Sequence, residues 1–186
     1  FDPACVDRQA VGSWQPPSPK FNYLMGIDPN FAGADYFVAQ VWCLSGTVPM
    51  LVAQYRENNQ AIEYSLNEVY KLIQDYRPTL VAVESNSGGI IILERLTILL
   101  PDTRFEKVVT THTSKIQNTN RLSIMVRQAE LIYPSDWSGI TEMKAFSASK
   151  REATTGHDDS VMAAAVAFAW ARECYPQAMA SGTYIY

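Results

Sequence analysis

The chain has 186 residues, of which 47% are hydrophobic, so it is long enough for one sizeable core but short for two ordinary domains joined by a linker. Its formal net charge of -4 at pH 7 argues against a domain that binds nucleic acid over its whole surface, because phosphate contacts require lysine and arginine. We therefore expect one compact domain whose contacts with any nucleic acid are local.

The cysteines and the apolar runs exclude further classes. Cys5, Cys43 and Cys174 are widely spaced and form no C-x-x-C motif, which argues against a disulfide framework and a structural zinc site and fits a reducing cytosol. The longest apolar stretches, such as Val161 to Trp170, fall short of the roughly 18 residues of a membrane-spanning helix. The sequence also opens with no secretory segment, and we expect no membrane partner.

The N-terminal third combines a proline-rich stretch with short strands. Residues 1–20 contain prolines and no sustained hydrophobic period, which predicts a linker or lead-in, with the folded domain over residues 21–186. Three aromatic and β-branched runs, broken by segments with Gly, Pro and Asn, then predict a meander of antiparallel strands. These runs are Tyr23–Asp28, Tyr36–Trp42 and Pro49–Tyr55.

The rest of the chain alternates between helical and strand patterns. Ile62–Tyr76 has apolar residues at helical spacing and ends at Arg77-Pro78, and Thr79–Glu84 is nearly all apolar, as in a buried strand. Further expected elements are a helix over Ile90–Leu99, a strand over Arg104–Thr110, a helix over Asn118–Ala129, a short apolar piece at Leu131–Tyr133, a helix around Ile140–Ser147 and an alanine-rich helix over Asp159–Cys174. This order predicts a mixed α/β domain with a central sheet.

Two carboxylates stand at the ends of predicted strands. Asp28 closes the first strand, where a buried carboxylate needs water, a cation or a hydrogen-bond partner, although Asp-Pro-Asn is also a good turn sequence. Glu84 closes a strand that is otherwise apolar, and glutamate is a poor strand and core residue. Capping of the following helix is the alternative role for Glu84, but Ser87 would be sufficient for that.

Two further acids, Asp158 and Asp159, open the alanine-rich helix after His157. One acid at this position suits the helix dipole, and Asp158 or Asp159 is the expected cap, but adjacent carboxylates repel each other unless a cation lies between them. Together the acids form a set of hard oxygen ligands suited to Mg²⁺ or Mn²⁺. Two such ions can activate a water molecule and stabilise the leaving oxygen of a phosphodiester.

These acidic segments carry a resemblance to a known family. The strings YLMGIDPNFAGADYFVAQVW, VAVESNSGG and GHDDSVMAAAVAFAW resemble the C-terminal nuclease domain of the large terminase subunit, the DNA-packaging motor of tailed bacteriophages and herpesviruses. The resemblance covers about residues 21–174, and the segment GHDDSVMA is its most specific part.

The resemblance implies a fold, an activity and a metal site. The fold is ribonuclease-H-like, with a five-stranded mixed sheet of three antiparallel and two parallel strands flanked by helices. The activity is metal-dependent cleavage of concatemeric double-stranded viral DNA when packaging starts and when the head is full. Asp28 is implied to touch both metal ions and Glu84 to be the acid of the fourth strand. Asp159 is implied to be the last acid, with Asp158 as an added ligand, and the division of roles within this pair stays open.

The family also directs attention to basic residues near the acids. Between Arg104 and Arg151 the sequence has eight basic residues and four acidic ones. We expect phosphate contacts from four of them, and a substrate contact from the histidine beside the acidic pair. These residues are Lys115, Arg121, Lys150, Arg151 and His157. Ordinary surface charge is the alternative interpretation for the four basic residues, and an ordinary polar loop residue is the alternative for His157.

One departure from the family concerns the motor. No G-x-x-x-x-G-K-[ST] phosphate loop is present, so this chain lacks the ATPase of the full subunit. The implied partners are double-stranded DNA, an N-terminal ATPase domain, the small terminase subunit and the portal protein, in the cytoplasm of a host cell. Alternatives are a Holliday-junction resolvase or transposase with the same metal chemistry, an actin-like ATP-binding domain, and a DNA-binding module without catalysis.

Overall fold

The computed structural model describes residues 1–30, 35–86, 88–147, 152–153 and 156–170. Within these ranges the strands are β1 (Ala10–Gly12), β2 (Tyr23–Asp28), β3 (Phe37–Cys43), β4 (Met50–Glu57), β5 (Leu80–Glu84), β6 (Phe105–Val108), β7 (Ile132–Pro134), β8 (Phe146–Ser147) and β9 (Glu152–Ala153). The helices are α1 (Pro3–Asp7), α2 (Ile62–Tyr76), α3 (Gly89–Leu99), α4 (His112–Arg127), α5 (Gly139–Ala145) and α6 (Asp159–Ala169).

The central sheet contains the expected five strands and two more. In the described part of the chain its order is β1-β7-β4-β3-β2-β5-β6. Strands β2, β3 and β4 are antiparallel neighbours, and β5 and β6 run parallel to β2, which confirms the predicted mixed core. The predicted total of five is too small, because β7 pairs in parallel with β4 and β1 with β7. Strand β7 overlaps the short apolar piece expected at Leu131–Tyr133, but the sequence did not show that it pairs with the sheet. Strand β1 has only three residues, too few for a hydrophobic period to reveal it.

Residues 1–20 contribute α1 and β1 to the fold. Cys5 and Val6 are buried, the side-chain amide of Gln9 donates to the Val126 carbonyl at 2.6 Å, and the hydroxyl of Tyr133 donates to the Val6 carbonyl at 2.7 Å. These long-range contacts stabilise elements that are too short to leave a local pattern. The division of the chain at residue 20 stays a prediction.

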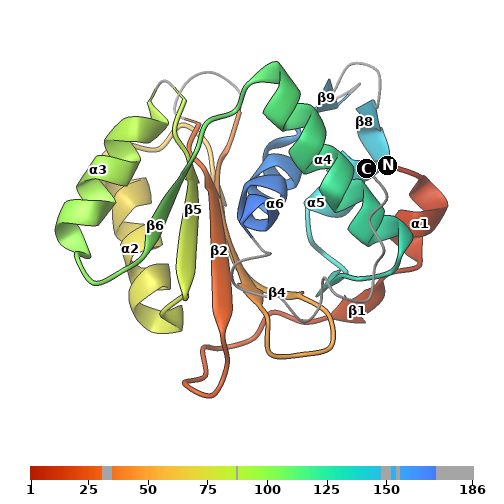
Figure 1. Ribbon diagram of the computed structural model, residues 1–186, viewed down its shortest axis with the longest axis horizontal. Coiled ribbons are helices and arrows are strands. Elements are labelled where there is room, and N and C mark those ends of the chain that lie inside the picture. The colour runs from red at the N-terminus through yellow and green to blue at the C-terminus, as the bar shows by residue number, and fades with distance from the viewer. Residues whose placement is uncertain (31–34, 87, 148–151, 154–155, 171–186) are drawn as a thin grey trace.

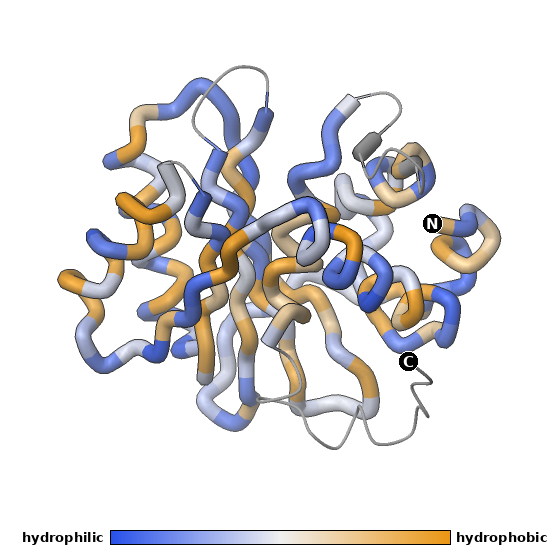
Figure 2. The backbone as a smooth tube through the Cα atoms, turned by 45° about the horizontal axis from the view of Figure 1, so that its top comes forward, coloured by the Kyte–Doolittle hydropathy of each residue, from blue (hydrophilic) through white to orange (hydrophobic). Residues whose placement is uncertain are grey.

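Helices cover both faces of the sheet and form two hydrophobic cores. Helices α2 and α3 lie on one face, and α4, α5 and α6 lie on the other (Figure 1). Helix α3 is largely hydrophobic and lies at one side of the molecule (Figure 2). Its Ile98 is 79% exposed. Over the described residues, no helix combines the length and apolar character needed to cross a membrane.

The bounds of the helices agree with the sequence-based prediction in some places and differ from it in others. Helix α2 has the predicted bounds, and the residue after its last turn, Arg77, has a left-handed φ of 48°. Helix α4 begins at His112, well before the predicted Asn118, because Thr111 and Ser114 form a capping box ahead of a polar first turn. The short strands β8 and β9 have no counterpart in the prediction. The predicted extension of α6 to Cys174 lies largely outside the described residues.

Candidate active site

The strand-end acids Asp28 and Glu84 project from the same face and edge of the sheet. Strands β2 and β5 are parallel, and Ile27 pairs with Val83 one residue before the two acids. Side chains alternate along a strand, so Asp28 shares its face with Leu24, which packs in the core beneath α6. The fold therefore delivers the two carboxylates side by side, facing the start of α6.

Helix α6 brings the acidic pair to this edge by packing directly on β2. A Cβ atom on Gly26 would lie 2.3 Å from the carbonyl oxygen of Ala163 and 2.6 Å from the Cβ of Ala167. Glycine in the strand and alanines in the helix thus permit a very close approach. This approach places Asp159 and Asp158 near enough to Asp28 for their charges to affect it.

Burial and the neighbouring acids disfavour the charged form of Asp28. Burial raises the pKa of this carboxyl well above its ordinary range, and the charge of Glu84 and a hydrogen bond to Glu84 raise it further. The charges of Asp159 and Asp158 add to the same effect. The structure therefore brings together all four acids singled out from the sequence. Such an arrangement of carboxylates is unfavourable at neutral pH unless protons or cations bind there.

Asp159 is the second buried acid of the group. Burial raises its pKa to about 6, although a hydrogen bond from the backbone N–H of Tyr36 opposes the shift. Only 4% of the residue is exposed. Asp159 is therefore partly protonated near pH 6, and a cation would compete with that proton.

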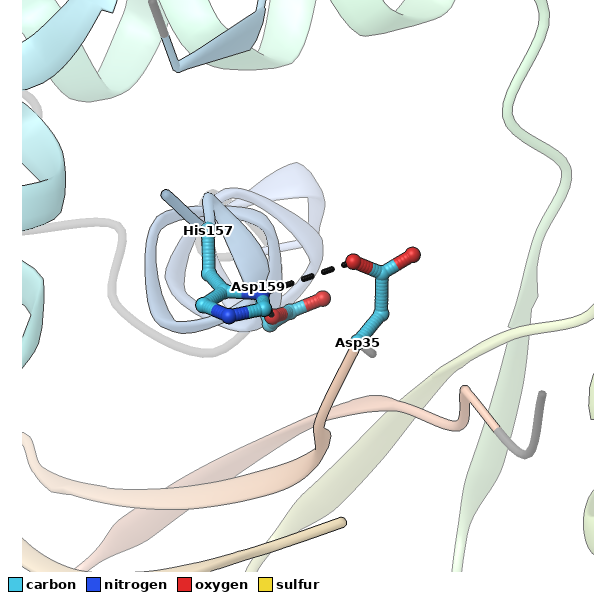
Figure 3. A group of neighbouring side chains, drawn as sticks. All are labelled: Asp35, His157 and Asp159. Atoms are coloured by element: carbon cyan, nitrogen blue, oxygen red, sulfur yellow. Dashed lines mark ion pairs between the residues drawn. The ribbon is translucent and has the colours of Figure 1, made fainter. Parts of the chain in front are cut away.

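Asp35 also belongs to this group, although the sequence patterns did not predict it as a site residue. Figure 3 shows Asp35 pointing toward His157 beside Asp159, and one ligand atom from each of the three lies within 4.8 Å of the others. The Nδ1 atom of His157 is 3.4 Å from Asp35 and 3.5 Å from Asp159. Asp35 comes just before β3. Because β3 runs antiparallel to β2 and Val38 lies opposite Asp28, β3 starts at the same edge of the sheet. The signal was the second acid in DPNFAGAD, which resembles a turn.

The residues present fit a divalent cation. Among the described side chains, the Oδ2 atom of Asp159 and the Nδ1 atom of His157 are buried without a hydrogen-bond partner. Buried polar atoms are normally paired, so these atoms are suited to a ligand. The surrounding donors are mainly carboxylate oxygens, which Mg²⁺ and Mn²⁺ prefer.

The predicted cap of α6 is corrected by the structure. Asp158 occupies the N-cap position but makes no capping hydrogen bond through its side chain. Glu142 of α5 takes that role: its carboxylate accepts from the backbone N–H groups of Ser160 at 2.7 Å and Val161 at 3.1 Å. A cap from another helix leaves the side chains of Asp158 and Asp159 available at the sheet edge.

Glu84 is oriented by a neighbour that the sequence did not single out. The side-chain amide of Asn86 donates to Glu84 at 3.4 Å and to the Thr110 carbonyl at 2.6 Å. The N–H of Thr110 donates back to Asn86 at 3.2 Å. Asn86 therefore ties the end of β5 to the segment that leads into α4. The serine suggested as an alternative cap, Ser87, lies outside the described residues.

The predicted DNA-contacting residues fall into different places. Lys115 of α4 reaches the acids, with its Nζ atom 3.5 Å from Asp158. Arg121 instead donates to the carbonyl oxygens of Phe168 and Ala169 at 3.0 and 2.9 Å, which gives it a structural role at the far end of α6. Lys150 and Arg151 lie outside the described residues. His157 lies within the acidic group, between Asp35 and Asp159.

The sequence also matches a known family. Residues 25–169 match the family described as the terminase RNaseH-like domain. The chain belongs to this family. The match confirms the predicted family of this terminase domain and favours it over the resolvase, transposase and actin-like alternatives. A comparison with curated protein sequences gave no match.

Solved structures support the fold of this terminase domain. The large terminase nuclease of thermophilic phage G20c, crystallised with bound zinc, has a TM-score of 0.74 at 20% identity, covering 89% of this chain and 96% of that chain. The large terminase nuclease domain of Thermus phage P74-26 has a TM-score of 0.71 at 19% identity, covering 99% and 97%. The large terminase of bacteriophage HK97 has a TM-score of 0.68 at 9% identity, and 42% of that chain is covered.

Proposed function

We propose that this terminase domain is the nuclease of a large terminase subunit, which cuts concatemeric double-stranded viral DNA when packaging starts and ends. The observation that carries the proposal is the convergence of strand-end and helix-start carboxylates around Asp28, whose pKa is raised by burial and by neighbouring acids. The carboxylates at this edge repel one another, and divalent cations bound between them would relieve that repulsion. The G20c nuclease has been crystallised with magnesium, cobalt and zinc.

The proposed cofactor is a pair of Mg²⁺ or Mn²⁺ ions held by the acids at this edge. The proposed ligands are Asp28, Glu84, Asp158 and Asp159, with Asp35 added by the structure. When bound, such ions activate water and stabilise the leaving oxygen of the phosphodiester. The protein supplies two buried carboxylates for them, Asp28 and Asp159. Glu84 and Asp158 are half-buried and Asp35 is exposed.

The residues around the acids have roles in placing the substrate. Lys115, whose side chain is 28% exposed, balances the charge of Asp158 and lies where it can reach a DNA phosphate. His157 lines a pocket of about 290 Å³ together with Arg56 and Thr141. We propose that DNA lies across this edge, consistent with an overall acidic chain that carries only local positive charge.

The proposed partners follow from the family. The HK97 large terminase is longer than this chain, which covers 42% of it, and we propose that an ATPase domain of the same subunit holds the nuclease on DNA. The small terminase subunit and the portal protein are the other proposed partners, in the host-cell cytoplasm.

The direct test is plasmid cleavage by the purified chain with Mn²⁺ or Mg²⁺. We expect nicked and then linear products, no cleavage in EDTA, and loss of cleavage by Asp28→Asn, which keeps the shape of the side chain and removes its charge. Asp75→Asn is the matched control, because Asp75 is exposed on α2, across the sheet from the acids. Cleavage in EDTA, or by Asp28→Asn at the wild-type rate, would refute the proposal.

A further inference from the structure

Ser160, the residue that follows Asp159 in α6, is fixed through three of its polar groups. It is fully buried. Its N–H donates to Glu142 at 2.7 Å, its hydroxyl contacts Glu142 at 3.1 Å and Ser138 at 2.8 Å, and its carbonyl accepts from Gln40 at 3.0 Å. The position of Asp159 is therefore determined by contacts from α5 and β3 as well as by α6 itself.

Glu142 provides the largest share of these contacts. Its carboxylate accepts from the N–H groups of Ser160 and Val161, which have no acceptor within α6. A negative charge at this end also complements the helix dipole. The side chain of Glu142 is only 7% exposed, and Arg56 lies 3.2 Å from it as a counter-ion. A buried carboxylate with this many partners has a defined position.

Arg56 connects the same carboxylate to the acidic group. Its guanidinium lies 3.4 Å from the centre of the Tyr36 ring, and that ring meets the His157 ring edge-to-face at 4.9 Å. The backbone N–H of Tyr36 hydrogen-bonds to Asp159. Glu142 and Arg56 therefore both lie beside the start of α6, and direct contacts connect them to Asp159 and His157.

We propose that Glu142 is a positioning residue for the metal centre, with Arg56 as its counter-ion. By holding the first turn of α6, Glu142 sets where the carboxylates of Asp158 and Asp159 lie relative to the two strand-end acids. The inference rests on the proposed nuclease function and assigns it a residue outside the ligand set. Displacement of a ligand by about 1 Å is sufficient to impair such a site.

The test compares Mn²⁺ affinity, measured by calorimetry, with Mn²⁺-dependent plasmid cleavage in variants of the whole chain. All measurements are made well below the melting temperature of each variant. Glu142→Gln keeps one oxygen acceptor for the helix but loses the ion pair with Arg56, and we expect about 3- to 10-fold weaker Mn²⁺ binding. Glu142→Ala loses both, and we expect weakening of about 10- to 100-fold, with a matching rise in the Mn²⁺ concentration needed for cleavage.

Leu66→Ala is the control for loss of stability alone. Leu66 is buried in the core between α2 and the opposite face of the sheet, so this variant lowers the melting temperature without touching α6. Wild-type Mn²⁺ affinity in Leu66→Ala, together with weakened affinity in both Glu142 variants, supports the proposal. Wild-type affinity in folded Glu142→Gln and Glu142→Ala, or equal weakening in Leu66→Ala, overturns it.

The same experiment separates this inference from the function on which it rests. If the wild-type chain neither binds Mn²⁺ nor cleaves plasmid, the nuclease proposal fails and the positioning role fails with it. If the wild-type chain does both and the Glu142 variants match it, only the positioning role fails.

Discussion

Gly26 of β2 and Ala163 of α6 lie so close together that a Cβ atom on the glycine would be 2.3 Å from the alanine carbonyl oxygen. The same atom would be 2.7 Å from the backbone nitrogen of Ala167. Backbone atoms cannot move aside as a flexible side chain can, so this contact sets the distance between the sheet and the helix that carries Asp159.

Gly26→Ala should therefore displace α6 and damage both the fold and the acidic group. We expect a loss of stability of about 1–3 kcal/mol or more, as for other overpacked cores, and weaker Mn²⁺ binding in the protein that remains folded. Thermal unfolding and calorimetry measure the two effects. Gly46→Ala is the control, because its nearest new contact would be the Val48 carbonyl oxygen at 3.4 Å. Equal stability of the two variants would contradict the close-packing argument.

Asp35→Asn should weaken metal binding, because Asp35 faces His157 and Asp159 in the same group. We expect Mn²⁺ affinity to fall about tenfold, less than for the deeply buried Asp28, and cleavage to require more metal. Titration of Mn²⁺ into each protein measures the change. Asp102→Asn, at an exposed position after α3, is the control. An unchanged affinity in Asp35→Asn would remove Asp35 from the site.

The stability of the metal-free domain should fall as the pH rises from about 4 to about 7. The pKa of Asp159 is raised by burial from 3.8 to about 6 in the folded protein. A carboxyl with a raised pKa stabilises the fold while it is protonated, and this contribution is lost as the pH passes its folded-state pKa. A tenfold difference in proton affinity between the folded and unfolded states corresponds to about 1.4 kcal/mol of unfolding free energy.

Melting temperatures in EDTA across this pH range measure the effect, and saturating Mg²⁺ above pH 7 should reverse it, since a ligand that binds only the folded state stabilises it. Asp159→Asn cannot titrate and should show a shallower decline. If Asp159→Asn and the wild-type chain follow the same curve, the buried carboxyl is not the cause.

Arg121→Ala should lower stability without affecting DNA binding, whereas Lys115→Ala should weaken DNA binding without affecting stability. Arg121 donates to the last carbonyls of α6, so its loss should cost about 1–2 kcal/mol and lower the melting temperature by a few degrees. The salt dependence of DNA binding should stay unchanged. Lys115→Ala should leave the fold intact and reduce the salt slope by about 1, because Lys115 lies at the acidic edge.

Binding of a labelled duplex at several salt concentrations, alongside thermal unfolding, distinguishes the two residues. A reduced salt slope in Arg121→Ala, with no change in its melting temperature, would restore the sequence-based prediction that Arg121 contacts DNA.

Local sequence patterns are sufficient to predict the mixed sheet and most of the acids at its edge. The helix at Ile62–Tyr76 and the strand that ends at Asp28 were predicted with their observed bounds, because helical and strand periods are properties of neighbouring residues. Glu84 and the Asp158-Asp159 pair stand out for the same reason. Acids at the end of an apolar strand, or doubled at a helix start, conflict with their local surroundings.

Contacts between distant segments hold these residues together, and the sequence patterns do not show them. Asp35 joins the acids through the register of a hairpin, Glu142 caps a helix from another helix, and Arg121 serves the far end of α6. Each of these three contacts joins segments that are distant in the sequence. The short strands β1 and β7 likewise pair with each other across most of the chain. A local pattern contains no information on such pairings, because their free energy arises only when the segments meet.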